Sequence, residues 1–251
     1  MQSTNSSDFA VTYVPEKNKD LEFEIRPMTN DRIAEINMIT SGVFITMEPF
    51  WSSTGATHED LHIVFEMLGN DCMKNGLGLA CYEKKTGELA AAIYNGDAAN
   101  EVTFDDQIEV AKVQGRNKLI ENLLMLKDIA SQCEAAAPGT YKKPANKGEA
   151  LHLNVVCCVP KYQNLGIITR MVRFMLNEHP VIKNYKHIVS EAYTPGSRIP
   201  FERNGFKVVH QVLFKDFEKD GKRPLAHIED TLKSKGYRPS DGMRCMVYDK
   251  E

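Results

Sequence analysis

A largely apolar segment that runs straight into a short turn and then a helical pattern constrains the fold more than any other part of the chain. The apolar segment covers residues 151–158, and the turn contains Gln163 and Gly166. Beyond the turn, apolar residues recur at helical spacing from Ile167 to Met175. A strand that leads directly into an amphipathic helix is typical of α/β proteins, so we predict that class.

Periodicity places further elements on both sides of this unit. Apolar runs bounded by turn residues predict strands, and apolar residues three and four apart predict helices. We predict six further strands at residues 21–25, 77–82, 89–94, 187–193, 206–214 and 243–248. We predict helices at residues 31–39, 57–68, 108–134 and 197–204, and a Lys/Pro/Gly loop from Thr140 to Gly148. These elements give a central sheet of about seven strands flanked by helices.

The pattern indicates one domain behind a polar N-terminal segment. Residues 1–20 are polar and aperiodic, which indicates a mobile tail or an edge segment, and we predict a flexible tail. Residues 21–251 contain no repeat or low-complexity segment. A chain of 251 residues is long enough for one domain with a sizeable core, and we predict a single domain over 21–251.

Charge and cysteine content argue against several classes of protein. The net charge of −3 gives no general attraction to phosphate backbones, so a nucleic-acid partner is not expected. No apolar run reaches the roughly 18 residues of a membrane span, and the N-terminal residues lack the apolar region of a signal peptide. The six cysteines show neither zinc-binding spacing nor the density of a disulfide scaffold. We therefore expect a cytoplasmic protein with reduced thiols and no membrane partner.

The turn at residues 163–166 has the properties of a pyrophosphate site. The first N–H groups of the following helix have no intrahelical partner, and the helix dipole is positive at this end. Gly166 would let the backbone approach a phosphate closely. A plain strand-to-helix turn explains the same four-residue spacing, so the turn alone leaves both interpretations open.

A longer string of residues around the turn is more specific. Val156-x-Cys158-x-Pro160-x-Tyr162-Gln163-x-x-Gly166-Ile167 resembles the acetyl-coenzyme A motif of the GNAT superfamily, and the run from Phe201 to Phe206 resembles its next signature. The resemblance implies the GNAT acyltransferase fold, a mixed central sheet flanked by helices, with acetyl-CoA (acyl-CoA) as co-substrate. It implies cofactor contacts from Val156, Cys157, Cys158, Gln163, Asn164, Leu165, Gly166, Ile167, Ile168, Thr169 and Phe201.

Within the superfamily, the chain is most similar to the invertebrate arylalkylamine (dopamine) N-acetyltransferases. Met47-Glu48-Pro49-Phe50 resembles their Asp-Glu-Pro-Leu element, and Tyr162–Ile167 resembles their Tyr-Arg-Gly-Leu-Gly-Ile turn. Phe214–Phe217 with Asp220–Lys222 resembles a later segment of the same family. The resemblance runs from about Phe23 to the C-terminus. It implies transfer of an acetyl group to a small primary amine, with an arylalkylamine as the expected acceptor.

The same resemblance implies catalytic roles. Glu48 matches a Glu that acts as base through water, a role in which a carboxylate accepts the proton of the amine. Of the family's two hydroxyl residues four apart, Ser197 matches one, and Tyr193 stands at the other. Backbone N–H groups from Val156 to Cys158 would meet the oxyanion where two strands diverge. A solvated Glu before a proline is the alternative for Glu48, and a helix N-cap is the alternative for Ser197.

Two positions depart from the superfamily pattern. Ile168 stands where Gly or Ala is usual. Phe201 stands where many GNAT enzymes have a Tyr that protonates the leaving thiolate. These departures motivate an alternative function, an inactive GNAT fold that only binds acyl-CoA or a protein partner.

Aromatic residues after Glu48 indicate where the amine binds. Phe50 and Trp51 are predicted to line an aromatic pocket, with burial in the core as the alternative. His152, on the strand before the cofactor turn, is predicted to line the pocket or the core. The expected partner is a small-molecule amine, and the expected assembly is a monomer or weak dimer.

A third function is suggested by His58-Glu59-Asp60-Leu61-His62, which matches the His-Glu-x-x-His pattern of zinc proteases. The pattern lacks the continuation that supplies a third ligand. The segment that begins at Thr57 also fits a capping box at the start of a helix. We predict the capped helix and no bound metal.

Overall fold

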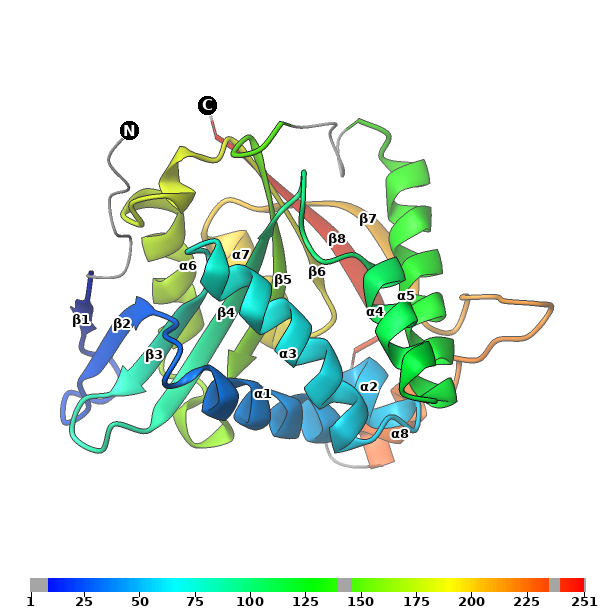
Figure 1. Cartoon of the computed structure of the whole chain (residues 1–251), viewed down its shortest axis with the longest axis horizontal. Coiled ribbons are helices and arrows are strands. Elements are labelled where there is room, and N and C mark those ends of the chain that lie inside the picture. Colours follow the sequence, from blue (N-terminus) through cyan, green and yellow to red (C-terminus); the bar gives the residue numbers. More distant parts are fainter. Residues whose placement is uncertain (1–8, 140–145, 235–239, 251) are drawn as a thin grey trace.

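The computed structural model describes residues 9–139, 146–234 and 240–250 (Figure 1). Its strands are β1 (Val11–Tyr13), β2 (Phe23–Pro27), β3 (Leu79–Glu83), β4 (Leu89–Asp97), β5 (Ala150–Cys158), β6 (His187–Ala192), β7 (Lys207–Leu213) and β8 (Gly242–Asp249). Its α-helices are α1 (Ile33–Met47), α2 (Pro49–Ser53), α3 (His58–Lys74), α4 (Phe104–Val113), α5 (Asn117–Ala136), α6 (Ile167–Asn177), α7 (Pro195–Arg203) and α8 (Ile228–Ser234). Two 3-10 turns, η1 (Pro160–Tyr162) and η2 (Ile182–Asn184), complete the described elements.

One mixed sheet forms the centre of the molecule. Its strand order is β1-β2-β3-β4-β5-β6-β8-β7. β5 and β6 pair in parallel, and the other neighbouring strands pair antiparallel. The predicted α/β class with a mixed sheet is confirmed. The eighth strand is β1, which makes residues 11–13 an edge segment, while residues 1–8 of the predicted tail lie outside the described residues.

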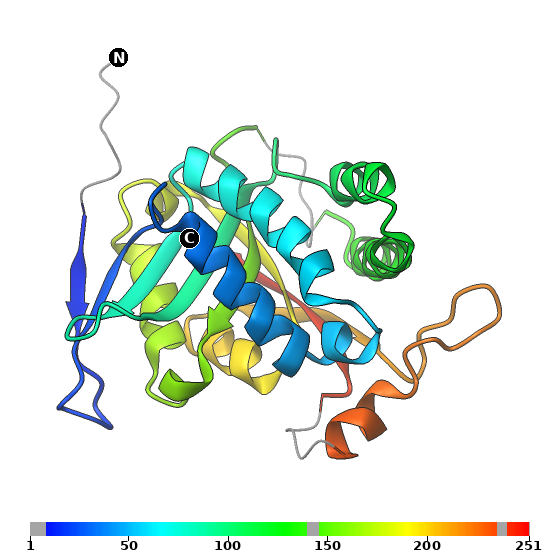
Figure 2. The same ribbon diagram turned by 60° about the horizontal axis from the view of Figure 1, so that its bottom comes forward.

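Helices cover both faces of the sheet. α1, α3, α4 and α5 lie on one face, and α6 and α7 lie on the other (Figures 1 and 2). α1 is attached to β4 by a buried polar contact, because the Tyr94 hydroxyl lies 3.0 Å from Asn37 Oδ1 and 3.2 Å from Thr40 Oγ1. This contact fixes α1 on the sheet and therefore fixes the position of Glu48 at its end.

β5 and β6 diverge in the middle of the sheet. Their pairing covers Ala150–Leu153 against His187–Ser190, whereas β5 continues to Cys158. The opposite edge of β5 stays paired with β4 as far as Cys158. The sheet is therefore open on one side of residues 154–158, which include the N–H groups that the resemblance assigns to oxyanion binding.

The long helix predicted at residues 108–134 is two helices. α4 ends at Val113 and α5 begins at Asn117, because Gly115 between them adopts a left-handed conformation (φ 66°). Periodicity does not reveal α2 and α8, which have only five and seven residues. Most of the predicted Thr140–Gly148 loop, residues 140–145, lies outside the described residues. None of the described helices is long and apolar enough to cross a membrane.

Two of the six cysteines are bonded to each other. Cys133 on α5 and Cys245 on β8 form a disulfide, with Cα atoms 6.2 Å apart and a sequence separation of 112. The expectation of reduced thiols is therefore wrong for this pair, because the fold brings together two cysteines whose spacing carries no local signal. The other four cysteines are free.

Candidate active site

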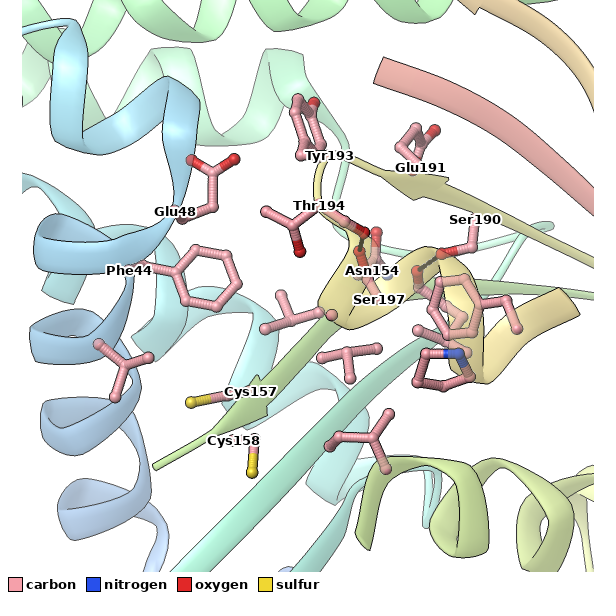
Figure 3. Close-up of a pocket in the computed structure, with 18 of the residues that line it drawn as sticks. Phe44, Glu48, Asn154, Cys157, Cys158, Ser190, Glu191, Tyr193, Thr194 and Ser197 are labelled. Carbon is pink, nitrogen blue, oxygen red and sulfur yellow. Dashed lines mark hydrogen bonds between the residues drawn. The ribbon is translucent and has the colours of Figure 1, made fainter. Parts of the chain in front are cut away.

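A deep cleft opens where β5 and β6 diverge. Its volume is about 1140 Å³, and residues of β5, β6, α1, α5, α6 and α7 line it. Figure 3 shows Glu48, at the end of α1, across the space from Tyr193 and Thr194. Because α6 and α7 cover one face of the sheet and α1 and α5 the other, the cleft joins the two faces.

The predicted pyrophosphate turn lines this cleft over its whole length, from Gln163 to Thr169. Asn164 and Gly166 have positive φ values of 64° and 79°, and Gly166 is the N-cap of α6. The N–H groups of the first turn of α6 lack intrahelical partners, and the positive end of the helix dipole lies here. Such a turn can bind the pyrophosphate of coenzyme A.

Two side chains hold the cofactor turn in place. Nε2 of Gln163 donates to the carbonyl of Cys158 at 3.3 Å, which ties the turn to the end of β5. The Tyr13 hydroxyl on β1 donates to the carbonyl of Leu165 at 2.8 Å. Tyr13 was missed by the sequence reasoning because it lies in a polar, aperiodic segment, and only tertiary structure brings it to the turn.

The side chains at the two positions that depart from the superfamily pattern, Ile168 and Phe201, are both buried. Ile168 is only 7% exposed, so most of its side chain packs beneath the cofactor turn. Phe201 lines the cleft, is buried and packs on Phe206 with 5.2 Å between ring centres. Phe201 has no hydroxyl, so it cannot protonate a leaving thiolate.

Val156, Cys157 and Cys158 line the cleft at the open edge of β5. Burial raises the pKa of both thiols to about 12, so they stay protonated and are poor nucleophiles. The backbone of this strand, rather than its thiols, is the part suited to contact an acyl group. Backbone N–H groups next to a diverging strand can stabilise an oxyanion.

Glu48 lies between α1 and α2 and lines the cleft. Its Oε2 accepts the N–H of Trp51 at 2.7 Å, and its Oε1 is buried with no hydrogen-bond partner in the described part of the chain. Burial raises the pKa of Glu48 to about 7, against opposing hydrogen bonds from the Trp51 and Phe50 backbone. A carboxyl group with this pKa and one uncommitted oxygen can accept a proton at neutral pH.

Ser197 is the third residue of α7 and lines the cleft. Its Oγ donates to the carbonyl of Thr194 at 3.1 Å. The N-cap of α7 is Thr194, so the N-cap alternative for Ser197 is wrong. Thr194 also lines the cleft and adds a hydroxyl that sequence reasoning missed, although it lies between the two predicted positions.

Tyr193 lines the cleft beside these hydroxyls, and its ring stacks on Phe214 with 6.4 Å between centres. Burial and then the negative charges of Glu191 and Glu48 raise the pKa of Tyr193 well above its ordinary value. The hydroxyl therefore stays protonated and can act as a hydrogen-bond donor. The structure brings Tyr193, Ser197 and Glu48 to one cavity.

One of the two predicted aromatic residues reaches the cleft. Trp51 lines it, whereas Phe50 is fully buried and packs edge-on against Trp51 at 5.2 Å. The direction of the short helix α2 places the Phe50 side chain in the core. The predicted substrate contact of Phe50 is therefore corrected, and this residue packs in the core instead. Phe44 and Phe104 supply further aromatic surface in the cleft.

His152 lines the cleft and lies between two carboxyl groups. Its Nδ1 is 3.1 Å from both oxygens of Glu101, and its Nε2 is 2.8 Å from Glu191 Oε2. Sequence reasoning found His152 but missed Glu101 and Glu191, which are 51 and 39 residues away in sequence. Burial, and then the charge of Glu101, raises the pKa of Glu191 to about 8.

Charged residues differ between the two sides of the cleft. Arg173 of α6 and Arg203 of α7 line the side of the cofactor turn, where cations favour phosphate groups. Glu48, Glu101 and Glu191 line the side that faces α1 and α4, where carboxylates favour an ammonium. The cleft can thus hold an anionic cofactor and a cationic acceptor at its two ends.

The His-Glu-x-x-His segment begins α3 and lies outside the cleft. Thr57 and Asp60 form both hydrogen bonds of a capping box, and Glu59 pairs with Arg116 at 2.6 Å. Searched over the described residues, the structure contains no group of three or more His, Cys, Asp or Glu that could hold a metal. The capped helix is therefore the local structure of this segment.

Comparison with known proteins gives matches at the level of structure. No family model matches the chain, and no curated protein matches it by sequence. The C-terminal condensation domain of Ebony, solved with beta-alanyl-dopamine, matches with a TM-score of 0.67 and 18% identity, over 91% of this chain and 99% of that one. Arylalkylamine N-acetyltransferase 2 from Aedes aegypti matches with a TM-score of 0.65 and 9% identity, over 91% and 99%.

A bacterial structure connects the fold to a cofactor. The structure of yncA from Salmonella typhimurium, solved with its cofactor acetyl-CoA, matches with a TM-score of 0.50 and 11% identity, over 91% of this chain and 94% of that one. Identities this low compare folds. The mixed sheet, the divergence of β5 and β6 and these matches together show that the chain has the fold of the GNAT acetyltransferases, and that it matches the insect arylalkylamine N-acetyltransferases and Ebony-related domains in structure.

Proposed function

We propose that the protein is an N-acyltransferase that moves an acetyl group from acetyl-CoA to a small primary amine. The observation that supports this most directly is the cleft at β5 and β6, which joins the N-terminus of α6 to the buried carboxyl of Glu48 through the gap between these strands. A phosphate-binding turn and a base with a pKa near 7 then face one reaction centre.

Direct transfer follows from the groups in the cleft. Acetyl-CoA, when bound, supplies the acyl thioester. Glu48 takes a proton from the ammonium, directly or through one water, so that the amine nitrogen can attack the acyl carbon. N–H groups of residues 156–158 stabilise the oxyanion, and Ser197 or Thr194 can donate a hydrogen bond to the sulfur as the C–S bond breaks. The nitrogen gives up its second proton as the amide forms, and the thiolate takes up one proton and leaves as free CoA. The protonated thiols of Cys157 and Cys158 take no covalent part.

The acceptor class is the finer part of the proposal. The sequence resemblance favours an arylalkylamine, and Trp51, Phe44 and Phe104 give the cleft aromatic surface that could hold a flat ring. The Aedes aegypti enzyme of similar fold is named for arylalkylamines. Aromatic monoamines are therefore the first acceptors to test.

A thiol-release assay with acetyl-CoA tests the function. The acceptor panel contains aromatic monoamines, diamines, amino acids and peptides, and each rate is compared with hydrolysis in the absence of an acceptor. We expect amine-dependent release of free CoA and formation of an N-acetylated product by mass spectrometry. Tight acetyl-CoA binding without release by any amine would instead support an inactive acyl-CoA-binding protein.

A further inference from the structure

Phe44 lies beside the candidate base on α1. Thr40, Phe44 and Glu48 are four residues apart, so they follow one another along the same side of the helix. Phe44 and Glu48 both line the cleft. In Figure 3, the Phe44 ring points into the cavity and lies between Glu48 and Cys157 in the view. An aromatic ring is therefore part of the wall next to the reaction centre.

Further aromatic rings hold Phe44 in place. Its ring packs edge-on against Phe65 of α3 with 4.9 Å between ring centres, and Phe65 packs on Tyr94 of β4 at 6.0 Å. The Tyr94 hydroxyl is in turn held by its contacts with Asn37 and Thr40. Phe65 and Tyr94 are buried. Because these neighbours are closely packed, Phe44 cannot move toward them without disturbing the core.

The geometry of a thioester determines where its alkyl group lies. The acyl carbon holds oxygen, sulfur and the alkyl group in one plane, and an amine attacks from outside that plane. In the proposed function, the oxygen points to the N–H groups of residues 156–158. The sulfur comes from the face of the sheet that α6 and α7 cover, where the cofactor turn lies. The alkyl group therefore points away from α6 and α7, toward the face that α1 covers.

Cys157 and Phe44 meet the alkyl group on that face. The Cys157 thiol interacts with the side chain of Thr40, so Cys157 faces α1. Phe44 is the next residue along the same side of α1. Apolar residues of α3 line the cleft farther along this face, namely Val64, Phe65 and Leu68. Because Phe44 packs on Phe65, its ring lies between the reaction centre and this apolar wall.

We propose that Phe44 limits the length of the acyl group, so that the protein transfers short acyl groups such as acetyl and excludes longer ones. The inference rests on the proposed function, in which the thioester lies at residues 156–158. An acetyl group has only a methyl on this side, whereas each further methylene would press on a ring that its neighbours hold. Removal of the ring would open a path to the apolar wall of α3, which favours an alkyl chain.

A series of acyl donors tests the inference. Acetyl-, butyryl- and hexanoyl-CoA are compared with the best amine of the thiol-release panel, and each N-acylated product is identified by mass spectrometry. The amine nitrogen replaces the sulfur on the acyl carbon in each case, so free CoA is released from every donor. For the parent protein, we expect kcat/KM to fall at least tenfold from acetyl- to hexanoyl-CoA. Calorimetry without an amine should give the same order of affinities.

Two substitutions of Phe44 should change this order by different amounts. Phe44→Ala should use hexanoyl-CoA at least as well as acetyl-CoA, because each methylene that the new space buries contributes about fourfold in affinity. Phe44→Leu fills part of the space, so it should accept butyryl-CoA but not hexanoyl-CoA. This second variant keeps the test decisive if Phe44→Ala is unstable.

Phe104→Ala is the matched control. It removes another ring that lines the cleft, at the start of α4, and should keep the donor order of the parent. Circular dichroism shows whether each variant is folded.

Two results would overturn the inference. One is a parent protein that uses hexanoyl-CoA as well as acetyl-CoA. The other is a folded Phe44→Ala that keeps the donor order of the parent, and a higher KM for the amine with every donor would then assign the ring to the acceptor. In both cases acetyl transfer persists, and only this inference fails. If no amine is acylated, the proposed function fails, and calorimetry still shows whether Phe44 selects the acyl chain of the bound donor.

Discussion

Glu48 Oε2 accepts the backbone N–H of Trp51 at 2.7 Å, so the candidate base is also the residue that caps α2. The cap uses one carboxylate oxygen and leaves Oε1 without a partner in the described chain. Substitutions can separate the two roles, because an amide oxygen can accept the capping hydrogen bond but a neutral amide cannot take a proton from an amine.

Glu48→Gln should therefore keep the fold and lose activity. We expect kcat to fall by about a hundred to ten thousand fold, the usual effect of losing a general base. Glu48→Ala should lose the same activity and also about 1 kcal/mol of stability, because it removes the N-cap. Glu66→Gln, at an exposed position of α3, is the matched control. Turnover of Glu48→Gln within threefold of the parent would place the base elsewhere.

The stability of the protein should fall as pH rises through the neutral range, in part through Glu191. Its pKa is raised from 4.5 to about 8, so the folded state binds a proton that the unfolded state has released. The resulting stability is complete below about pH 4.5 and is lost as pH rises through about 8. Glu191→Gln should show a shallower decline between pH 5 and pH 9 in urea unfolding. Equal slopes for variant and parent would contradict the raised pKa.

Gly166→Val should weaken acetyl-CoA binding at least tenfold in isothermal titration calorimetry. A Cβ at this position would lie 3.1 Å from the Tyr13 hydroxyl, and the left-handed backbone (φ 79°) resists a β-branched residue. Gly87→Val is the control, since Gly87 is also left-handed (φ 71°) and a Cβ there meets nothing within 4 Å. The two variants should have similar backbone strain. Loss of acetyl-CoA affinity in Gly166→Val but not in Gly87→Val would identify residues 163–169 as the cofactor turn.

Reduction of the Cys133–Cys245 disulfide should lower the free energy of unfolding by about 2–4 kcal/mol. The bond closes a loop of 112 residues, which restricts the unfolded chain. Urea unfolding with and without dithiothreitol measures the effect. Cys133→Ala should be as unstable as the reduced parent and should not respond to the reductant. A parent protein that is equally insensitive would show that the thiols are reduced.

Tyr13→Phe should raise the dissociation constant for acetyl-CoA about two- to tenfold, the effect of one hydrogen bond. The hydroxyl donates to Leu165 O within the cofactor turn, so its loss frees the turn without removing a direct contact. Tyr248→Phe, a hydroxyl removed from the far strand β8, should leave the affinity unchanged. Equal affinities for Tyr13→Phe and the parent would mean that the turn holds its shape unaided.

Patterns in the sequence predict the part of the site that one continuous stretch of chain forms. The apolar strand, Gln163 and Gly166 follow one another directly, so one stretch of chain contains the whole cofactor turn. Glu48 is found through its neighbours in sequence. Even so, the direction of α2 decides that Trp51 faces the cleft and Phe50 faces the core, and no pattern in five residues encodes that direction.

The acidic side of the cleft could not be predicted in this way. Glu191 meets His152 because β5 and β6 pair. Glu101 meets His152 because Gly96 on β4 has no side chain that would displace it. The break between α4 and α5 is different, since Gly115 was a visible signal within an otherwise helical pattern.

Because Tyr13 contacts the cofactor turn, the domain begins earlier in the chain than hydrophobic patterning indicates. Hydrophobic patterning would start it near Leu21, and a protein shortened to that boundary would keep the other strands of the sheet. It would nevertheless lose the hydroxyl that holds Leu165, together with Lys17, which lines the cleft beside it. We therefore expect the shortened protein to bind acetyl-CoA less tightly than the whole chain, because the turn loses this hydrogen bond.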